Sequence, residues 1–480
     1  MKKVSRAGRS AGAVLLVLLL VLFVRLLEGP RVLHAGVAPP HGADSPQVLV
    51  GLFRAKSVTF RSGGKWFLAT SAGEKISLNP GNSLTLAASG QRISWEVQGT
   101  GAKGTSAGNI LVSPASPEGP FISVSSSGGS SATFSAYRGS MVVLNDGGNL
   151  LVANAVAMEE YVQSVVGAEM IDSWPLEAAR AQAVAVRSYA AYKTGLRKDT
   201  LQRDYVGSFS YLRPEDVLIW ATDQVYRGIA EETERTIAAA SSTRGEILTY
   251  QGLPAATYYH ADAGGMTEDP CYVWGRSVPY LVPVVEVPHE SPHSSWEVVL
   301  MPSDLSGALE RLGTSHAGTP DTVRGLEQGV SGRWFTILVG SGDASCVVRG
   351  TDLRSVLPQI KSTLFSAYVL GGGREVTGSL SAGMCFSVAG AQGARTDVHL
   401  GSSYVIGGFG GPAPLSESGG TAVLSGLRSD GAPRILLQGA GWGHGVGLSQ
   451  WGAREMALMG KDAWDILELY YPGLMPEKWW

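Results

Sequence analysis

Near residue 158 the sequence changes from a strand-like pattern to a helical one. Before it, short alternating apolar runs such as Val48–Phe53 and Met141–Leu144 are separated by Gly, Asn and Ser, which predicts strands joined by tight turns. After it, Glu159–Met170 has helical spacing, and a second helix is expected to begin at Pro175 and end near Gly195,. We therefore expect an α+β fold, with a strand-rich body that carries a helical pair.

Further elements follow the helical pair. Helices are expected at Ala230–Ser241, Ser303–Leu312, Gly447–Met459 and Asp462–Tyr471, and strands at Glu246–Tyr250 and Ala255–His260,. We expect one domain over residues 47–480, with the helical pair and the C-terminal helices around a substrate cleft. Residues 286–350 and 370–435 are expected to form inserted subdomains.

The N-terminus reads as a targeting segment. A basic tail (residues 1–10) with Lys2, Lys3, Arg6 and Arg9 precedes an apolar stretch (residues 11–28), and a linker rich in Pro and Gly covers residues 29–46,. The basic flank places the start of the chain in the cytoplasm. An uncleaved anchor in the cytoplasmic membrane and a cleaved signal segment both fit, and both predict an extracytoplasmic protein.

Composition narrows the classes of partner and cofactor. The net charge is -3, so no basic field exists to hold nucleic acid. The cysteines Cys271, Cys346 and Cys385 are far apart and include no CxxC pair, which argues against a zinc ribbon or a redox motif. One disulfide with one thiol left over remains open.

Charged residues interrupt the Ala- and Val-rich second helix. Glu177, Arg180 and Arg187 stand at i, i+3 and i+10, which suggests one charged stripe. Such a stripe needs partners or a solvent-filled cleft. A substrate-facing stripe and a structural Glu177–Arg180 ion pair are the two interpretations.

Three other stretches could carry chemistry. Glu169 ends an apolar helix, where a carboxyl group can have a raised pKa and donate a proton or can simply be solvated,. The stretch YYHADAGGMTED (Tyr258–Asp269) is either a site loop or a polar hairpin,. In GAGWGHGVGLSQWGA (Gly439–Ala453), the glycines suggest positive φ angles, and N–H groups at the following helix start could bind an oxygen,.

Together these stretches resemble the SpoIID/LytB family, named for a stage II sporulation protein and an amidase enhancer. The matching segments stand in the family's order: Met158–Lys193, DQVYRG (Asp223–Gly228), Thr243–Gly252, Tyr258–Asp269, VWG (Val273–Gly275), PYL (Pro279–Leu281), GWGHGVGLSQWGA and YYPG (Tyr470–Gly473). The resemblance spans about residues 48–473 and implies a protein that acts on peptidoglycan.

Sporulation members of that family are lytic transglycosylases that cleave glycan strands stripped of peptides. Such an enzyme can work with one carboxyl group, unlike glycosidases with paired acids. The resemblance assigns the acid to Glu169 and substrate binding to residues on the following motifs. These are Arg180, Gln182, Arg187, His260, Gly265, Thr267, Glu268, His444 and Gln450, some of which are expected to brace the loops of the cleft.

The resemblance leaves the cofactor and the partners less defined. Some family members bind zinc through Cys and His, and His260 and Cys271 are the nearest candidates here. Two ligands are too few for a zinc site, so no metal is assigned and zinc stays open. Glycan strands and the membrane are the expected partners. The alternatives to an enzyme are a non-catalytic enhancer of a cell-wall amidase and a glycan-binding scaffold.

Overall fold

The computed structural model describes residues 45–480 apart from 117–118, 120, 127–132, 315–317 and 343; between 371 and 432 it describes only the strands β22–β27. The expected basic tail and apolar segment, and nearly all of the linker, lie outside these residues. Within the described ranges, no helix is both long enough and apolar enough to cross a membrane. The chain from Asp44 to Trp480 forms one compact unit.

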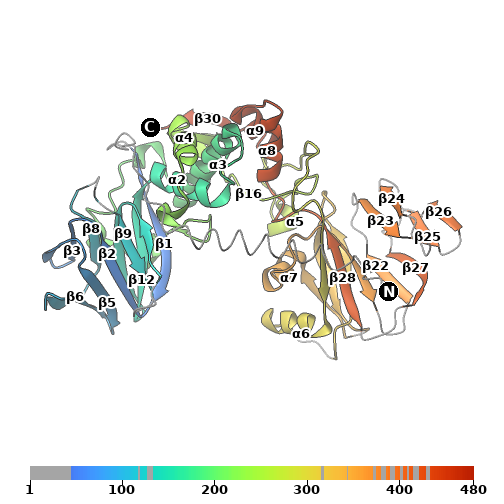
Figure 1. The fold of residues 1–480 in the computed structure, drawn as a ribbon, viewed down its shortest axis with the longest axis horizontal. Helices are drawn as coiled ribbons and strands as arrows, with labels where there is room; N and C mark the ends of the chain where they lie inside the picture. The colour runs from blue at the N-terminus through green and yellow to red at the C-terminus, as the bar shows by residue number, and fades with distance from the viewer. Residues whose placement is uncertain are drawn as a thin grey trace, which may run out of the picture. The chain divides into compact units, whose positions relative to one another are not determined.

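Two antiparallel β-sheets form the N-terminal part (Figure 1). One has the order β13-β1-β12-β11-β8-β3-β4, in which only β13 is parallel to its neighbour, and the other β10-β9-β2-β5-β6-β7. The strands are β1 (Gln47–Ala55), β2 (Ser57–Ser62), β3 (Trp66–Thr70), β4 (Lys75–Leu78), β5 (Ser83–Ser89), β6 (Arg92–Gln98), β7 (Lys103–Ser106), β8 (Ile110–Pro114), β9 (Ile122–Ser125), β10 (Ser135–Tyr137), β11 (Ser140–Asp146), β12 (Asn149–Ala157) and β13 (Ile219–Trp220).

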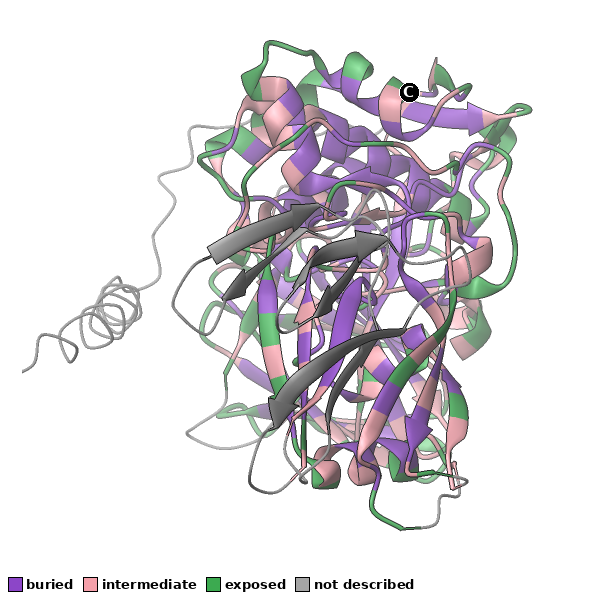
Figure 2. Ribbon diagram, turned by 90° about the vertical axis from the view of Figure 1, so that its right-hand side faces the viewer, coloured by how far each residue is buried: buried purple, intermediate pink, exposed green. Residues whose placement is uncertain are grey.

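Apolar alternation explains how the two sheets pack. In β6, every second residue is buried, and Ile93, Trp95 and Val97 join a core that also holds side chains from the other sheet, as expected for sheets that pack face to face. Strands β11 and β12 instead read as continuous apolar runs, because the opposite face of their sheet is also covered, by Tyr205 and Val217 among others. In Figure 2, buried residues are drawn purple and exposed residues green along the ribbon.

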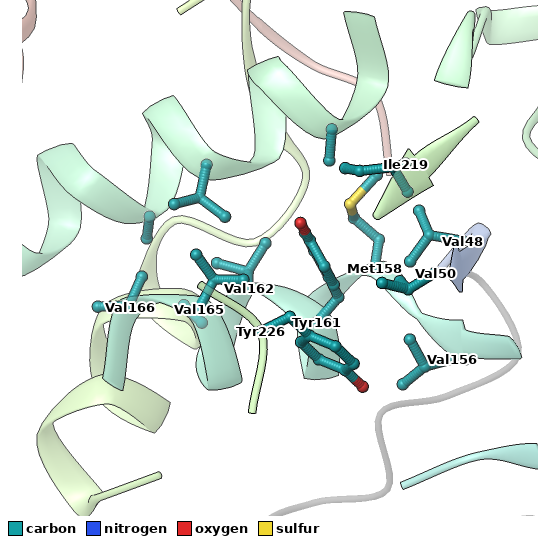
Figure 3. Close-up of a cluster of buried hydrophobic side chains, with 14 of the residues drawn as sticks. Val48, Val50, Val156, Met158, Tyr161, Val162, Val165, Val166, Ile219 and Tyr226 are labelled. Carbon is teal, nitrogen blue, oxygen red and sulfur yellow. The ribbon is translucent and has the colours of Figure 1, made fainter. Parts of the chain in front are cut away.

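The helices α2 (Met158–Glu169) and α3 (Leu176–Thr194) form the expected pair. Helix α2 begins directly after β12, and its apolar side joins the core of the sheets (Figure 3), where the rings of Tyr161 and Tyr226 lie 5.1 Å apart. Helix α3 ends where Gly195 adopts a left-handed conformation, with φ of 61°, which a glycine adopts without steric cost. Helix α4 (Glu234–Ser242) begins later than the sequence predicts, because residues 228–231 form a 3₁₀ turn, η5 (Gly228–Glu231).

The C-terminal segment returns to the helical pair. Strand β30 (Met475–Lys478) pairs with β14 (Glu246–Tyr250), which also pairs with β15 (Leu253–Pro254). Strand β29 (Leu448–Ser449) pairs with β16 (Tyr259–His260), so α8 (Gln450–Leu458) begins three residues later than predicted. Helix α9 (Ala463–Tyr470) follows, and both helices contact α3. The remaining short helical turns are η2 (Lys198–Thr200), η3 (Phe209–Tyr211), η4 (Pro214–Asp216) and α5 (Cys271–Trp274).

Residues 296–370 and 434–439 have a hydrophobic core of their own, which includes Leu305, Ile337 and Leu437. Its elements are β17 (Trp296–Leu300), α6 (Pro302–Arg311), β18 (Thr322–Gln328), β19 (Trp334–Gly340), β20 (Cys346–Arg349), α7 (Gly350–Val356), β21 (Phe365–Leu370) and β28 (Arg434–Gly439). Six further strands lie in sequence between β21 and β28: β22 (Glu375–Ser379), β23 (Cys385–Ala389), β24 (Arg395–His399), β25 (Tyr404–Gly407), β26 (Gly410–Pro414) and β27 (Thr421–Arg428). The expected α+β, strand-rich fold class is confirmed.

Candidate active site around Glu169

Glu169 is the last residue of α2, and three separate segments hold its carboxylate. Its Oε1 accepts a hydrogen bond from the backbone N–H of Val225 at 2.9 Å and a longer one from the Tyr259 hydroxyl at 3.5 Å. Its Oε2 accepts from the side-chain amide of Gln450 at 3.4 Å. Glu169 and Gln450, which are far apart in sequence, therefore lie next to each other.

Burial raises the pKa of Glu169 above its usual range, and the hydrogen bonds from Val225, Gln450 and Tyr259 offset part of that rise. Desolvation disfavours the charged carboxylate. The carboxyl group therefore keeps its proton at a higher pH than a solvated glutamate would, as a general acid requires.

Tyr259 extends this network. Its single hydroxyl proton is shared between Oε1 of Glu169 at 3.5 Å and Oε1 of Gln224 at 2.9 Å, and the Gln224 amide donates to the Tyr161 hydroxyl at 3.0 Å. Burial raises the pKa of Tyr259 well above 10, so its hydroxyl stays protonated and remains a donor. The chain of hydrogen bonds fixes the direction from which Tyr259 reaches Glu169.

His260 and His444 lie close together, with ring centroids 5.4 Å apart. Burial lowers the pKa of His260 well below its usual value, and it lowers the pKa of His444 to about 3, together with the charges of Arg354 and Arg333. Nδ1 of His444 accepts a hydrogen bond from the Val446 N–H at 3.0 Å. Both imidazoles are thus neutral near pH 7, which leaves Glu169 as the better placed proton donor.

Arg187 does not reach the region of Glu169, which corrects the predicted substrate contact. Its side chain is fully buried and forms a two-point ion pair with Glu159, with Nε–Oε1 and Nη2–Oε2 distances of 3.0 and 2.7 Å. The remaining donors reach backbone carbonyls, including that of Glu246 at 3.1 Å, and the Thr243 hydroxyl at 3.5 Å. A guanidinium group with all of these partners has no donor left for a sugar.

Arg180 and Gln182 are not among the described hydrogen-bond partners of Glu169. Arg180 forms the structural ion pair with Glu177 that was the alternative interpretation, and it donates to Ser242 at 3.0 Å. Gln182 is completely buried, and neither atom of its side-chain amide has a hydrogen-bond partner within the described residues. The three charged positions of α3 therefore do not form one exposed stripe.

The loop after β16 is braced from inside. Thr267 is fully buried and exchanges hydrogen bonds with Val284 through its backbone N–H and its hydroxyl. Glu268 accepts from Val330 and Ser331, and the N–H of Gly265 points to Glu286 at 3.3 Å. These predicted site residues hold the loop in place. Of the two roles expected for them, contact with substrate and bracing of the loops, the structure shows bracing.

The glycine-rich stretch has the predicted backbone conformation. Gly441, Gly443, Gly445 and Gly447 all have positive φ angles. Two N–H groups at the start of α8 already have acceptors, however, because Trp451 donates to the Ala261 carbonyl and Gly452 to the Ser449 hydroxyl. A capped helix start replaces the predicted oxygen-binding one.

His260 and Cys271 are not part of a metal-binding cluster among the described residues. Nδ1 of His260 lies 3.2 Å from the Val446 carbonyl oxygen, and Cys271 and Cys346 are free thiols. The side chain of Cys385 is not among those that the structure describes, so the predicted disulfide stays a prediction. The weak zinc candidates therefore gain no third ligand.

Four residues next to Glu169 were not predicted as site residues from the sequence: Tyr259, Gln224, Val225 and Arg227. Arg227 is exposed, and its positive charge opposes the rise of the Glu169 pKa. All four stand in the matched segments YYHADAGGMTED and DQVYRG. The signal was present as a motif, but its position next to Glu169 depends on the tertiary fold.

Comparisons with known proteins place these segments in context. The family model described as SpoIID, Stage II sporulation protein, matches residues 146–250. An uncharacterised protein of Brachyspira hyodysenteriae is 27% identical over 339 residues, which cover 70% of this chain and 71% of that protein.

Two named Bacillus proteins are similar as well. The amidase enhancer of Bacillus subtilis is 27% identical over 65% of this chain, but the match spans only 39% of the enhancer. Stage II sporulation protein D of Bacillus amyloliquefaciens is 25% identical over 66% of this chain and 74% of its own length. These matches confirm the resemblance to the SpoIID/LytB family that the motifs predict, and the SpoIID family model covers residues 146–250.

Proposed function

We propose that this chain is an extracytoplasmic cell-wall protein that cleaves peptidoglycan glycan strands as a lytic transglycosylase, with Glu169 as its general acid. The observation that carries the proposal is the Glu169 carboxyl group, which has a pKa raised by burial and donors from three segments around it. No second carboxylate is among its described hydrogen-bond partners.

The reaction balances with one carboxyl group. Protonated Glu169 gives its proton to the glycosidic oxygen between muramic acid and glucosamine, and the bond from the anomeric carbon to that oxygen breaks. The muramic 6-hydroxyl oxygen then bonds to the anomeric carbon, and its proton returns to the Glu169 carboxylate. No water is consumed, so the second carboxylate that activates water in inverting glycosidases is not needed.

The donors around Glu169 suit both halves of this cycle. While the carboxyl group is protonated, burial keeps the proton available at the pH of the wall. Once it is ionised, the Val225 N–H and the Gln450 amide can stabilise the negative charge,. Tyr259 keeps its own proton throughout and therefore acts as a positioning donor.

Mass spectrometry of the products from denuded glycan strands tests the proposal. The full chain, purified with a mild detergent, is compared with Glu169→Gln and with Glu160→Gln. Glu160 is the matched control, because it lies on the same helix and burial also raises its pKa, but its charged neighbours are Arg138 and Glu232.

Anhydromuramic ends from the wild type and Glu160→Gln but not from Glu169→Gln are the expected result. Reducing ends would indicate hydrolysis and a second catalytic group. Undiminished cleavage by Glu169→Gln would contradict the proposed acid.

A second function is favoured by the similarity to a protein named amidase enhancer. In that case the chain would produce no product alone but would speed the digestion of sacculi by a cell-wall amidase. Glu169→Gln would retain this effect, which separates the two functions. A scaffold would bind denuded glycan without either activity.

The location outside the cytoplasm follows from the N-terminal sequence and is part of the proposal. Fractionation of cells that express the full chain would test membrane anchoring against release. A cytoplasmic protein would contradict it.

A further inference from the structure

Asp262, Glu286 and His289 meet in the interior, next to the start of α8. One ligand atom from each lies within 4.8 Å of the others. Asp262 and Glu286 are 1% and 6% exposed, and the His289 side chain is 5% exposed. Two carboxylates and an imidazole withdrawn from water need strong compensation.

The spacing of these groups suits an ion between them. Nε2 of His289 lies 3.5 Å from Oδ1 of Asp262, which is longer than the ~2.8 Å of a charge-assisted hydrogen bond. Two ligands of a tetrahedral zinc ion with bonds of about 2.1 Å stand about 3.4 Å apart. The observed separation is close to the second value.

Each of the three side chains is also held by a hydrogen-bond partner from outside the cluster. His289 Nδ1 lies 3.1 Å from the Val287 carbonyl oxygen, to which it can donate its proton. The Nε2 lone pair then points toward the carboxylates, as in metal-binding histidines. Against burial, Asp262 and Glu286 raise the pKa of His289 to about 9, so a metal would have to displace the Nε2 proton of the imidazolium.

The carboxylates have comparable support. Asp262 accepts from the Gly264 N–H at 2.7 Å and from the Ser291 hydroxyl. Glu286 accepts from the Tyr470 hydroxyl at 3.0 Å and from the Gly265 N–H. Such outer hydrogen bonds fix ligand carboxylates in metal centres.

We propose that Asp262, Glu286 and His289 bind one divalent transition-metal ion, with zinc as the representative. The imidazole favours zinc or a similar ion over calcium and magnesium, which prefer oxygen ligands alone. Three protein ligands leave the fourth tetrahedral position for water. The proposal is independent of glycan cleavage and concerns a different cluster from His260 and Cys271.

The ion would join two segments behind the candidate active site. Asp262 belongs to the loop after β16, and Glu286 and His289 belong to the segment that leads to β17. The next residue of the loop, Ala263, donates to the Ser449 hydroxyl, and Gln450 follows Ser449 and contacts Glu169. The metal would therefore fix the loop after β16, which contacts the residue that precedes α8.

Zinc binding to the full chain tests this proposal. The chain is treated with a chelator, dialysed and titrated with zinc by calorimetry, and bound zinc is measured by elemental analysis. Glu286→Gln is compared with Glu290→Gln, which makes the same charge change at an exposed position of the same segment. Cobalt replaces zinc in a parallel sample, because its visible spectrum reports tetrahedral coordination without any use of activity.

We expect about one zinc per wild-type chain, a thermal midpoint a few degrees higher with zinc, and affinity lowered at least about 10-fold in Glu286→Gln alone. Absence of zinc binding by the wild type would reduce the cluster to an ion pair and hydrogen bonds, and would overturn the proposal. Binding that survives Glu286→Gln but is lost in Cys271→Ser would also overturn it. Binding of calcium or magnesium in preference to zinc would contradict the metal class. If Glu286→Gln unfolds, two other results decide whether the cluster binds a metal. These are the reversible cobalt spectrum of the wild type and the loss of that spectrum in His289→Gln.

Discussion

Replacing Arg187 with Met removes one half of a fully buried ion pair. The Glu159 carboxylate would keep its hydrogen bonds from the Gly245 N–H at 3.1 Å and the Trp480 indole at 2.9 Å, but it would lose its counter-charge. Breaking a buried pair in this way costs about 3–5 kcal/mol, because a charge remains in the interior without compensation. We expect Arg187→Met to lower the free energy of unfolding by this amount.

The expected shift in the thermal midpoint follows from the size of the unit. Residues 44–480 form one compact unit, and an unfolding entropy of ~2.1 cal/mol/K per residue gives about 0.9 kcal/mol/K for the unit. Differential scanning calorimetry should therefore show a midpoint about 3–5 °C lower. Adding Glu159→Gln removes the unpaired charge while it keeps an acceptor, so the double variant should recover part of the loss.

Arg180→Met is the matched control on the same helix. Arg180 and Glu177 are each about one-third exposed, and a surface ion pair contributes roughly 0–1 kcal/mol, so this variant should unfold near the wild-type temperature. An Arg187→Met protein with an unchanged midpoint but weakened binding to denuded glycan would refute the structural assignment and restore the substrate contact.

Three further results are expected. Cleavage should decline as pH rises through the raised pKa of Glu169, and initial rates measured across pH would show this fall. Ionisation of the buried carboxyl group also costs stability above that pKa, so at such pH Glu169→Gln should melt at or above the wild-type temperature,. A lower melting temperature of the variant would contradict the desolvation argument. Tyr259→Phe removes a hydrogen bond that lowers this pKa, so the falling limb of the rate profile should move to higher pH, while an unmoved limb would show that the hydroxyl does not act on Glu169. Gly447→Ala would place a Cβ 2.0 Å from the Tyr258 carbonyl oxygen at a φ of 71°, so calorimetry should show a larger loss than for Gly460→Ala, which has positive φ but open space and should lose only ~1–2 kcal/mol,.

Local patterns predicted the elements that local physics determines. Alternation in the N-terminal part identified strands such as Met141–Leu144, which lies within β11 (Ser140–Asp146). Pro175 and Gly195 marked the two ends of α3, because their backbone preferences are intrinsic to the residues,. The start of α8 was placed too early because pairing of β29 with β16 holds Leu448 and Ser449 extended, and that contact is not local.

The role of a charged side chain was harder to predict than its location on a helix. Arg187 stands on an Ala- and Val-rich helix, and the sequence showed that it needs a partner. Its partner Glu159 lies on the preceding helix, 28 positions away, in a segment where Glu160 and Glu169 were equally available by type. Only the packing of α2 on α3 chooses among these three acids.

The environment of Glu169 explains why motifs of modest individual specificity occur together over most of the chain. The helix α2 supplies the carboxyl group, residues 223–228 supply a backbone N–H, β16 supplies a hydroxyl, and α8 supplies an amide. Burial by all of these segments raises the pKa, and each donor then limits the rise,. A change in any one segment would therefore move the same proton, so each motif constrains a single chemical property that none of them could set alone.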